Sequence, residues 1–182
     1  NAYSGKSGTS FSVVRYGNVM GSRGSVIPLF LEQRKTGYLT ITDDRMTRFM
    51  ITLEQGISLV NYAFNDMSGG EIYVKKIPSM NILEIADAIS PNGEKKIIGI
   101  RPGEKLHEQM IGYEDAPFTL EYHDHYKILP NIHDWASDPM RRKEGVPVAS
   151  NFVYDSESNK QRMSINQLKS WVEKNADTFE AI

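Results

Sequence analysis

The sequence has no cysteine among its 182 residues, which excludes disulfide bonds and metal sites built on thiolates. It also has no apolar run near the roughly 20 residues that a membrane-spanning helix needs. An excess of charge is missing too, since the formal net charge is -2 whereas general nucleic-acid binders usually carry a basic excess. Hydrophobic residues make up 40% of the chain, as in ordinary globular proteins. We therefore expect a soluble cytoplasmic protein that binds neither nucleic acid nor membrane.

The first residues predict that the chain is part of a longer protein. Residues 1–10 are small and polar and include no initiator Met, and the apolar residues 11–16 follow them. A continuous apolar strand of this kind normally lies inside a parallel sheet with both faces covered. We expect the neighbours of this strand to come from chain outside the 182 residues.

Strands and helices alternate along the sequence, which predicts the α/β class. Thr52 with Gln55, Asn81 with Glu84, and Ser164 with Gln167 form capping-box pairs that mark helix starts. The helix from Thr52 is supported by apolar residues at helical spacing, namely Leu53, Ile57, Val60 and Phe64. We predict strands at 11–17, 38–42, 71–77, 95–100 and 125–129, and helices at 26–35, from 52 to the Gly69-Gly70 pair, at 81–90, around Glu104 and at 164–172. Residues 133–150 are predicted to be a polar surface loop.

A glycine-rich turn, residues 17–25, follows the first strand and precedes a helix. Glycines in that place let the backbone approach a phosphate at a helix N-terminus. The pattern alone leaves three interpretations open: a plain surface turn, a dinucleotide cofactor site, and a site for another phosphate ligand. Asp43, at the end of the next strand, suits the cofactor. The spacing G-x-x-x-G-x-x-G and the cation of Arg23 favour the other phosphate ligand.

Two further segments combine charges that suit a phosphorylated sugar. Arg45 and Arg48 place guanidinium groups near hydroxyls, and Arg101 and Glu104 follow a predicted strand. Guanidinium groups bind phosphate oxygens, and a carboxylate binds sugar hydroxyls. His123 and His125 alternate, but no third ligand accompanies them, so we predict no metal site.

Four segments of the chain resemble the extended short-chain dehydrogenase/reductase family, and within it the inverting UDP-N-acetylglucosamine 4,6-dehydratases. These segments are RYGNVMGSRGSVIPLF (15–30), ITDDRMTRFMITLEQG (41–56), GGEIYVKKIPSM (69–80) and GIRPGEKLHEQMI (99–111). The resemblance implies an enzyme that opens the pseudaminic acid pathway of flagellin glycosylation. It also implies a Rossmann domain that binds NADP and a smaller sugar-nucleotide domain. Residues 1–182 would then be the C-terminal sugar-nucleotide-binding portion, with 11–18 and 71–77 as strands of the Rossmann sheet.

The resemblance also implies roles for individual residues. Asn18 binds the substrate, UDP-N-acetylglucosamine, and Val19 packs near the nicotinamide. Thr42 contacts the nucleotide and Arg48 neutralises the diphosphate. The UDP pocket is lined by Arg23, Gly24, Ser25, Val26 and Ile27. The diphosphate and ribose are clamped by Arg101, Pro102, Gly103 and Glu104.

The family's catalytic residues are not expected in this chain. No tyrosine here is followed by a lysine four residues later, although the family uses such a pair. The resemblance places that pair, the catalytic Asp-Lys pair and the cofactor turn upstream of Asn1. We therefore expect 1–182 to be inactive alone and to need its own N-terminal domain, within a homo-oligomer when full-length. A UDP-sugar 4-epimerase of the same family and a non-catalytic nucleotide-binding module remain alternatives.

Overall fold

The chain divides into two compact units in the computed structural model, which describes residues 8–131 and 138–180. The first unit comprises residues 1–16, 53–76 and 109–155. The second unit comprises residues 17–52, 77–108 and 156–182. Each unit is therefore assembled from three separate stretches of sequence.

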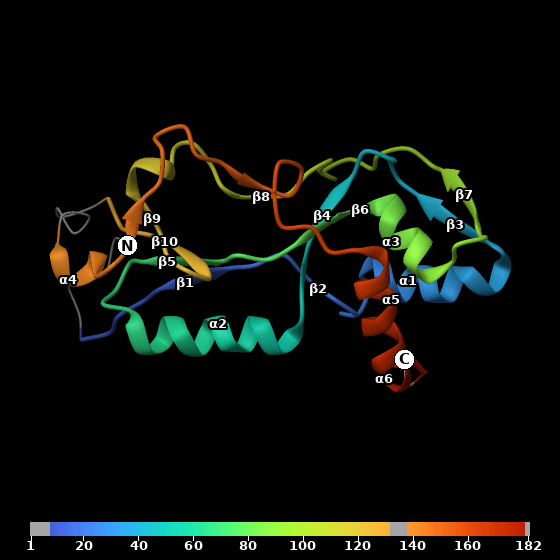
Figure 1. The fold of residues 1–182 in the computed structure, drawn as a ribbon, viewed down its shortest axis with the longest axis horizontal. Coiled ribbons are helices and arrows are strands. Elements are labelled where there is room, and N and C mark those ends of the chain that lie inside the picture. Colours follow the sequence, from blue (N-terminus) through green and yellow to red (C-terminus); the bar gives the residue numbers. More distant parts are fainter. Residues whose placement is uncertain (1–7, 132–137, 181–182) are drawn as a thin grey trace. The chain divides into compact units, whose positions relative to one another are not determined.

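A five-stranded mixed sheet, in the order β1-β5-β10-β9-β11, forms the framework of the first unit (Figure 1). The edge strand β1 (Val13–Arg15) runs parallel to β5 (Ile72–Lys75), and every other neighbouring pair is antiparallel. The remaining strands of this sheet are β10 (His125–Ile128), β9 (Thr119–Glu121) and β11 (Val146–Pro147). The strands predicted near 11–17, 71–77 and 125–129 are confirmed.

Helix α2 (Leu53–Asp66) lies along this sheet and buries only one of its sides (Figure 1). Leu59 and Ala63 are buried and form a small core with Tyr73 of β5. The predicted helix is confirmed. The apolar residues whose spacing predicted it are 45% to 74% exposed, however: Leu53, Ile57, Val60 and Phe64. The sequence has apolar side chains on two sides of this helix, and periodicity alone cannot tell which side the sheet covers.

Buried charges connect α2 and β5 to the later part of the first unit. Lys127 on β10 is 1% exposed, and its ammonium lies 2.5 Å from a carboxylate oxygen of Asp66. Arg141 on α4 (Pro139–Arg142) pairs with the buried Glu71 at 2.6 Å. Buried charges are tolerated when they are paired in this way.

The polar stretch 133–150 is therefore not wholly a surface loop. Residues 132–137 lie outside the described residues, but α4 and β11 are regular elements and Arg141 is largely buried. Pairing with Glu71, which is distant in sequence, outweighs the polar composition. A short antiparallel pair, β8 (Gln109–Ile111) with β12 (Tyr154–Asp155), completes the sheets of this unit, together with the short helix η2 (Ala116–Phe118).

The second unit combines small sheets with helices around one apolar core. Strand β2 (Asn18–Val19) runs parallel to β4 (Thr47–Ile51), which pairs antiparallel with β6 (Ser79–Asn81). A separate parallel pair joins β3 (Tyr38–Ile41) to β7 (Glu94–Ile97). The helices are α1 (Val26–Gln33), η1 (Arg34–Thr36), α3 (Ile82–Ile89), α5 (Ile165–Lys174) and α6 (Ala176–Glu180). The predicted α/β class with parallel strands is confirmed.

The core of the second unit fixes the segments that carry the predicted site. It includes Ile27 and Phe30 from α1, together with Met46, Met50 and Met80. Capping boxes begin α3 at Asn81 and α5 at Ser164, as the sequence predicted. No helix among residues 8–131 and 138–180 is long and apolar enough to cross a membrane.

The helix predicted around Glu104 is wrong, because residues 98–108 form turns and extended backbone. Gly99 and Gly103 both have a φ of 86°, in the left-handed region that a right-handed helix does not use. The carbonyl groups of Leu106 and Glu108 accept hydrogen bonds from the backbone of Thr47 and Ser156. These contacts from other segments take the place of the local helical hydrogen bonds.

Candidate functional site

The glycine-rich turn brings the N-terminus of α1 close to strand β4. A side chain at Gly17 would place its Cβ 2.3 Å from Cβ of Phe49, so only glycine allows this approach. Gly24 has a φ of 73°, which favours glycine, and Ser25 stands at the N-cap position of α1. The local sequence therefore sets where Asn18 and the start of α1 lie.

A cavity of about 230 Å³ lies within the second unit and opens between this turn, β3, β4 and the segment after β7. Four separate stretches of sequence contribute to it. Its lining residues are Asn18, Gly24, Ser25, Val26, Leu29, Phe30, Thr40, Thr42, Met46, Arg48, Ile82, Ile98, Arg101 and Glu104.

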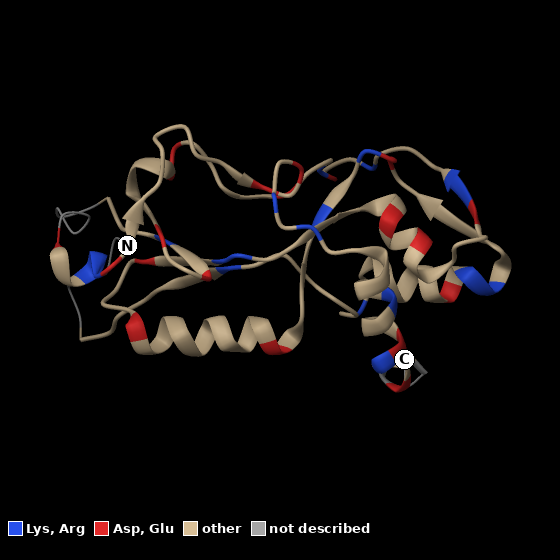
Figure 2. Ribbon diagram, in the orientation of Figure 1, with Lys and Arg blue, Asp and Glu red and all other residues tan. Residues whose placement is uncertain are grey.

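Two arginines, Arg48 and Arg101, line the cavity. Arg48, on β4, donates to the carbonyl oxygens of Thr47 and Leu106 at 2.7 and 3.0 Å, and these hydrogen bonds do not neutralise its charge. In the described part of the chain, no carboxylate oxygen lies within 4.0 Å of the guanidinium of Arg48 or Arg101. Figure 2 shows where the basic residues lie along the chain. The cavity thus offers positive charge to an anionic ligand.

Glu104 supplies a carboxylate beside these cations. Its Oε2 accepts a hydrogen bond from the backbone N–H of Arg101 at 3.0 Å, which holds the turn 101–104 closed. The other oxygen of the group can accept a bond from a hydroxyl. An arginine pair and a carboxylate together suit a phosphate joined to a sugar.

Arg45 does not take part in this arrangement. Its guanidinium makes two hydrogen bonds to Asp43, at 2.9 and 2.7 Å. These bonds hold the pKa of Asp43 at about 2, well below its usual range. Of the two arginines in the segment 45–48, only Arg48 reaches the cavity, and Asp43 is occupied by its own neighbour.

A hydrogen-bond network links Asn18, which is exposed, to the half-buried Glu108 and the buried residues Thr47 and Ser156. The side-chain nitrogen of Asn18 lies 2.5 Å from Oε1 of Glu108 in the orientation in which it can donate. Oε2 of Glu108 accepts from the backbone N–H of Phe49 at 2.9 Å. Burial raises the pKa of Glu108, while the Phe49 bond and the charges of Arg48 and Lys105 oppose the rise.

Ser156 and Thr47 extend the network. The Ser156 hydroxyl lies 2.7 Å from the Thr47 hydroxyl and accepts from the backbone N–H of Glu108 at 2.9 Å. Thr47 also lies 2.9 Å from Nδ1 of His107. Ser156 is fully buried, so its polar atoms are held in one arrangement.

The structure brings eight of the predicted binding residues to this cavity: Asn18, Gly24, Ser25, Val26, Thr42, Arg48, Arg101 and Glu104. It does not bring Val19, Arg23, Ile27, Pro102 or Gly103 to the lining. Ile27 is 1% exposed and belongs to the core, whereas Arg23 lies exposed in the turn. Pro102 and Gly103 are exposed in the turn that carries Arg101 and Glu104.

Sequence reasoning left Met46 open between core and pocket lining, and it missed five lining residues: Leu29, Phe30, Thr40, Ile82 and Ile98. Thr40 could have been found, because it lies two residues before Thr42 and alternate residues of a strand share a face. The apolar residues carry no comparable signal. It also missed Glu108, whose role depends on contacts with Asn18 and Phe49 from distant segments.

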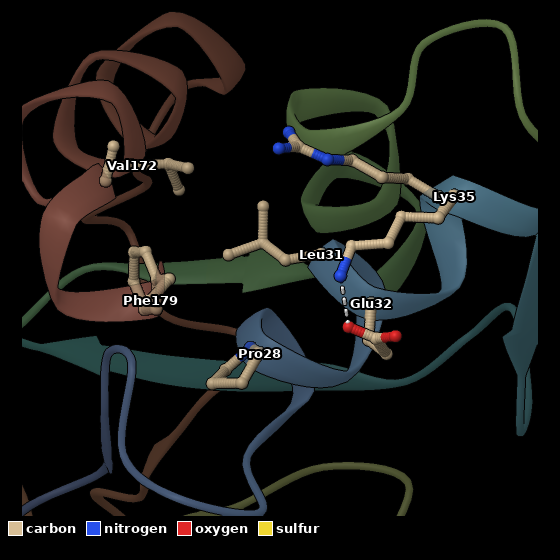
Figure 3. A pocket seen from close by; sticks show the side chains of 8 residues that line it. Pro28, Leu31, Glu32, Lys35, Val172 and Phe179 are labelled. Carbon is tan, nitrogen blue, oxygen red and sulfur yellow. Dashed lines mark hydrogen bonds and ion pairs between the residues drawn. The ribbon is translucent and has the colours of Figure 1, made fainter. Parts of the chain in front are cut away.

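A second, larger cavity of about 690 Å³ lies between α1, η1, α5 and α6. Figure 3 shows its apolar lining, with Leu31, Val172 and Phe179. Its rim carries the exposed pair of Lys35 and Glu32, whose atoms lie 2.7 Å apart. No predicted binding residue lines it. Among the described residues there is also no group of three or more side chains that could hold a metal ion.

Residues 1–130 match the family model described as "Polysaccharide biosynthesis protein". The chain belongs to this polysaccharide biosynthesis protein family. It is 47% identical over 176 residues to a UDP-N-acetylglucosamine 4,6-dehydratase (inverting) of Campylobacter jejuni strain 81-176. That match covers 92% of this chain and 52% of the relative. The predicted resemblance is confirmed.

The chain is also similar to epimerases. A UDP-glucose 4-epimerase of Rickettsia rickettsii is 43% identical over 125 residues, covering 66% of this chain and 37% of the relative. The chain spans about half the length of the dehydratases that it matches.

Solved structures agree with the fold. The X-ray structure of Pen from Bacillus thuringiensis is similar with a TM-score of 0.77 and 30% identity, over 92% of this chain and 49% of that one. A UDP-N-acetylglucosamine 4-epimerase from Methanobrevibacter ruminantium, in complex with UDP-N-acetylmuramic acid, has a TM-score of 0.56 and 17% identity. That match covers 97% of this chain and 49% of the epimerase. The second likeness concerns the fold alone.

Proposed function

We propose that this chain is the nucleotide-sugar-binding part of an inverting UDP-N-acetylglucosamine 4,6-dehydratase. The observation that carries the proposal is the cavity of the second unit, which gathers Arg48, Arg101, Glu104 and the glycine-rich turn. These groups match the diphosphate and the hydroxyls of a UDP-sugar. The 47% identity to dehydratases supports the choice of reaction.

The proposal assigns each group of cavity residues to one part of the UDP-sugar. Arg48 and Arg101 neutralise the diphosphate, and the turn at Gly24 and Ser25 lets it approach the start of α1. Glu104 accepts bonds from ribose hydroxyls. Thr42 contacts the nucleotide and Asn18 contacts the substrate. Four further residues belong to the segments that carry the site but do not line the cavity, and they fix the backbone there: Arg23, Ile27, Pro102 and Gly103.

The chemistry itself belongs to chain outside these 182 residues. The dehydratase reaction moves a hydride between the sugar and a nicotinamide, which the cofactor NADP supplies. The glycine-rich turn does not fit that cofactor, because it lines the cavity of Arg48 and has the wrong spacing. We assign only Val19 to the cofactor. Its main site and the catalytic acid, base and tyrosine then lie in an N-terminal domain, with β1 and β5 as strands of the shared Rossmann sheet.

The setting of the enzyme follows from the same proposal. It acts in the cytoplasm as a homo-oligomer, inverts C5 of the sugar, and feeds the synthesis of pseudaminic acid for flagellin glycosylation.

Calorimetry tests the binding role. Purified 1–182, checked for folding by circular dichroism, is titrated with UDP-N-acetylglucosamine and with NADP. We expect heat of binding with the UDP-sugar and no 4-keto product on incubation. Tighter binding of NADP, or turnover by the isolated chain, contradicts the proposal.

A UDP-sugar 4-epimerase is the second candidate, favoured by the 43% identity to the Rickettsia enzymes. The two reactions give different products from the longer protein. Proton NMR of the product mixture distinguishes a 4-keto-6-deoxy sugar from a sugar inverted at C4.

A further inference from the structure

We propose that Glu108 is a positioning residue that orients the Asn18 amide so that its carbonyl oxygen faces the ligand. This inference rests on the proposed function, because it takes the ligand to be a UDP-sugar. The ligand group at Asn18 is then an O–H or N–H donor of the sugar or nucleoside. A phosphate oxygen is excluded from that place, since it can only accept.

Both oxygens of Glu108 lie near the side-chain nitrogen of Asn18, Oε1 at 2.5 Å and Oε2 at 3.2 Å, and only Oε2 also faces the backbone of Phe49. Oε2 accepts from the backbone N–H of Phe49 at 2.9 Å, and that group can only donate. Oε1 lies 2.5 Å from the side-chain nitrogen of Asn18. An ionised carboxylate only accepts, so the reverse amide orientation would press two oxygens together without a proton between them. Glu108 thus selects one orientation of the amide.

The side chains of Glu108 and Asn18 both extend from backbone that is fixed by hydrogen bonds. The backbone of Glu108 exchanges hydrogen bonds with Ser156, at 2.9 Å to its hydroxyl and 2.8 Å from its N–H. Asn18 pairs with Met50 in the parallel ladder of β2 and β4. Side chains that are supported in this way lose little further freedom when a ligand binds.

The orientation of the Asn18 amide decides whether the cavity presents a hydrogen-bond acceptor or a donor to the ligand. The amide of Asn18 lines the cavity, and its nitrogen is taken by Glu108. The oxygen, on the other branch of the same carbon, remains as an acceptor. Because a carbonyl oxygen can only accept, an amide held in this orientation matches a donor on the ligand.

Glu108→Gln is the decisive variant. The N–H of Phe49 still needs an acceptor, so the new side-chain oxygen takes that bond and the new NH₂ group faces Asn18. The Asn18 amide must then turn, and it presents its own NH₂ to the ligand. We expect the affinity for UDP-N-acetylglucosamine to fall roughly tenfold, the effect of one mismatched hydrogen bond.

A second variant separates orientation from general damage. Asn18→Asp alone places two carboxylates together, and we expect weaker binding and a lower melting temperature. Asn18→Asp combined with Glu108→Gln restores a donor facing an acceptor and again leaves an oxygen toward the cavity. We expect the double variant to bind within about threefold of the wild type, because one matched hydrogen bond replaces another.

The outcomes separate this inference from the function that it rests on. If the wild type binds no UDP-sugar, the proposed function fails. If the wild type binds the UDP-sugar and Glu108→Gln binds it with equal affinity, the positioning role is wrong. The role is also wrong if the double variant binds no more tightly than the weaker of the two single variants.

A ligand-free measurement tests the same role independently. The side-chain ¹⁵N resonance of Asn18 should follow the ionisation of Glu108 as pH changes, and Glu108→Gln should abolish that titration. Burial raises the pKa of Glu108, and Arg48 and Lys105 are the charged groups that oppose the rise. A resonance that does not respond overturns the inference whatever the ligand.

Discussion

Replacing Asp66 by Asn should destabilise the first unit by about 3–5 kcal/mol, the usual cost of removing one partner of a buried ion pair. The side chain of Asp66 is 7% exposed and faces three donors. Lys127 lies 2.5 Å away, the Tyr73 hydroxyl donates at 2.8 Å, and Lys143 also pairs with it. The change keeps the shape of the side chain but leaves the ammonium of Lys127 buried without a counter-charge.

The pKa of Asp66 gives a separate quantity, the part of the stability that its ionisation contributes. Burial alone would raise this pKa, but the hydrogen bonds from Lys127, Lys143 and Tyr73 outweigh it and lower the pKa to about 2. Since the ordinary pKa of an aspartate is 3.8, ionisation contributes about 2 kcal/mol at neutral pH. A lowered pKa stabilises the fold above the unfolded value, so this contribution is lost as pH falls from about 4 toward 2.

Urea unfolding, monitored by far-ultraviolet circular dichroism, measures the free energy of unfolding at pH 7 and at lower pH values. Glu121→Gln is the matched control, because Glu121 pairs with Lys76 in the same unit but is 49% exposed. We expect it to cost less than about 1 kcal/mol. The double variant Asp66→Asn with Lys127→Met should recover part of the loss, since no unpaired buried charge remains. If Asp66→Asn costs no more than Glu121→Gln, the reasoning about the buried pair is refuted.

Three further predictions concern the second unit. Arg48→Ala should lower the affinity for UDP, measured by calorimetry, roughly tenfold, which is the value of a charge-assisted hydrogen bond. Arg45→Ala should change this affinity little, because Arg45 is hydrogen-bonded to Asp43. Equal losses for the two variants would contradict the assignment. Gly17→Ala should lower stability by about 1–3 kcal/mol, because its Cβ would meet Phe49, and an unchanged melting temperature would refute that contact. Ser156→Ala should also weaken UDP-N-acetylglucosamine binding, because it releases Glu108; unchanged affinity would show that the network is not needed.

The sequence by itself determined the α/β class, most of the elements, and the residue types of the site. Local signals suffice for these features: capping pairs mark the starts of α3 and α5, and apolar runs mark β1 and β5. The glycine spacing and Arg23 favoured a phosphate ligand other than a dinucleotide, while the pattern alone left a plain surface turn open. Family resemblance selected the residues, and eight of them line one cavity.

Only the tertiary structure decided which of these residues act together. Two arginines three positions apart looked equivalent in the sequence, yet one is bound to Asp43 and the other lines the cavity. The helix expected around Glu104 does not form, because Thr47 and Ser156 take the carbonyl groups that it would need. Glu108 gains its role from a residue 90 positions away. Such choices depend on contacts between distant segments, and no local pattern in the sequence encodes them.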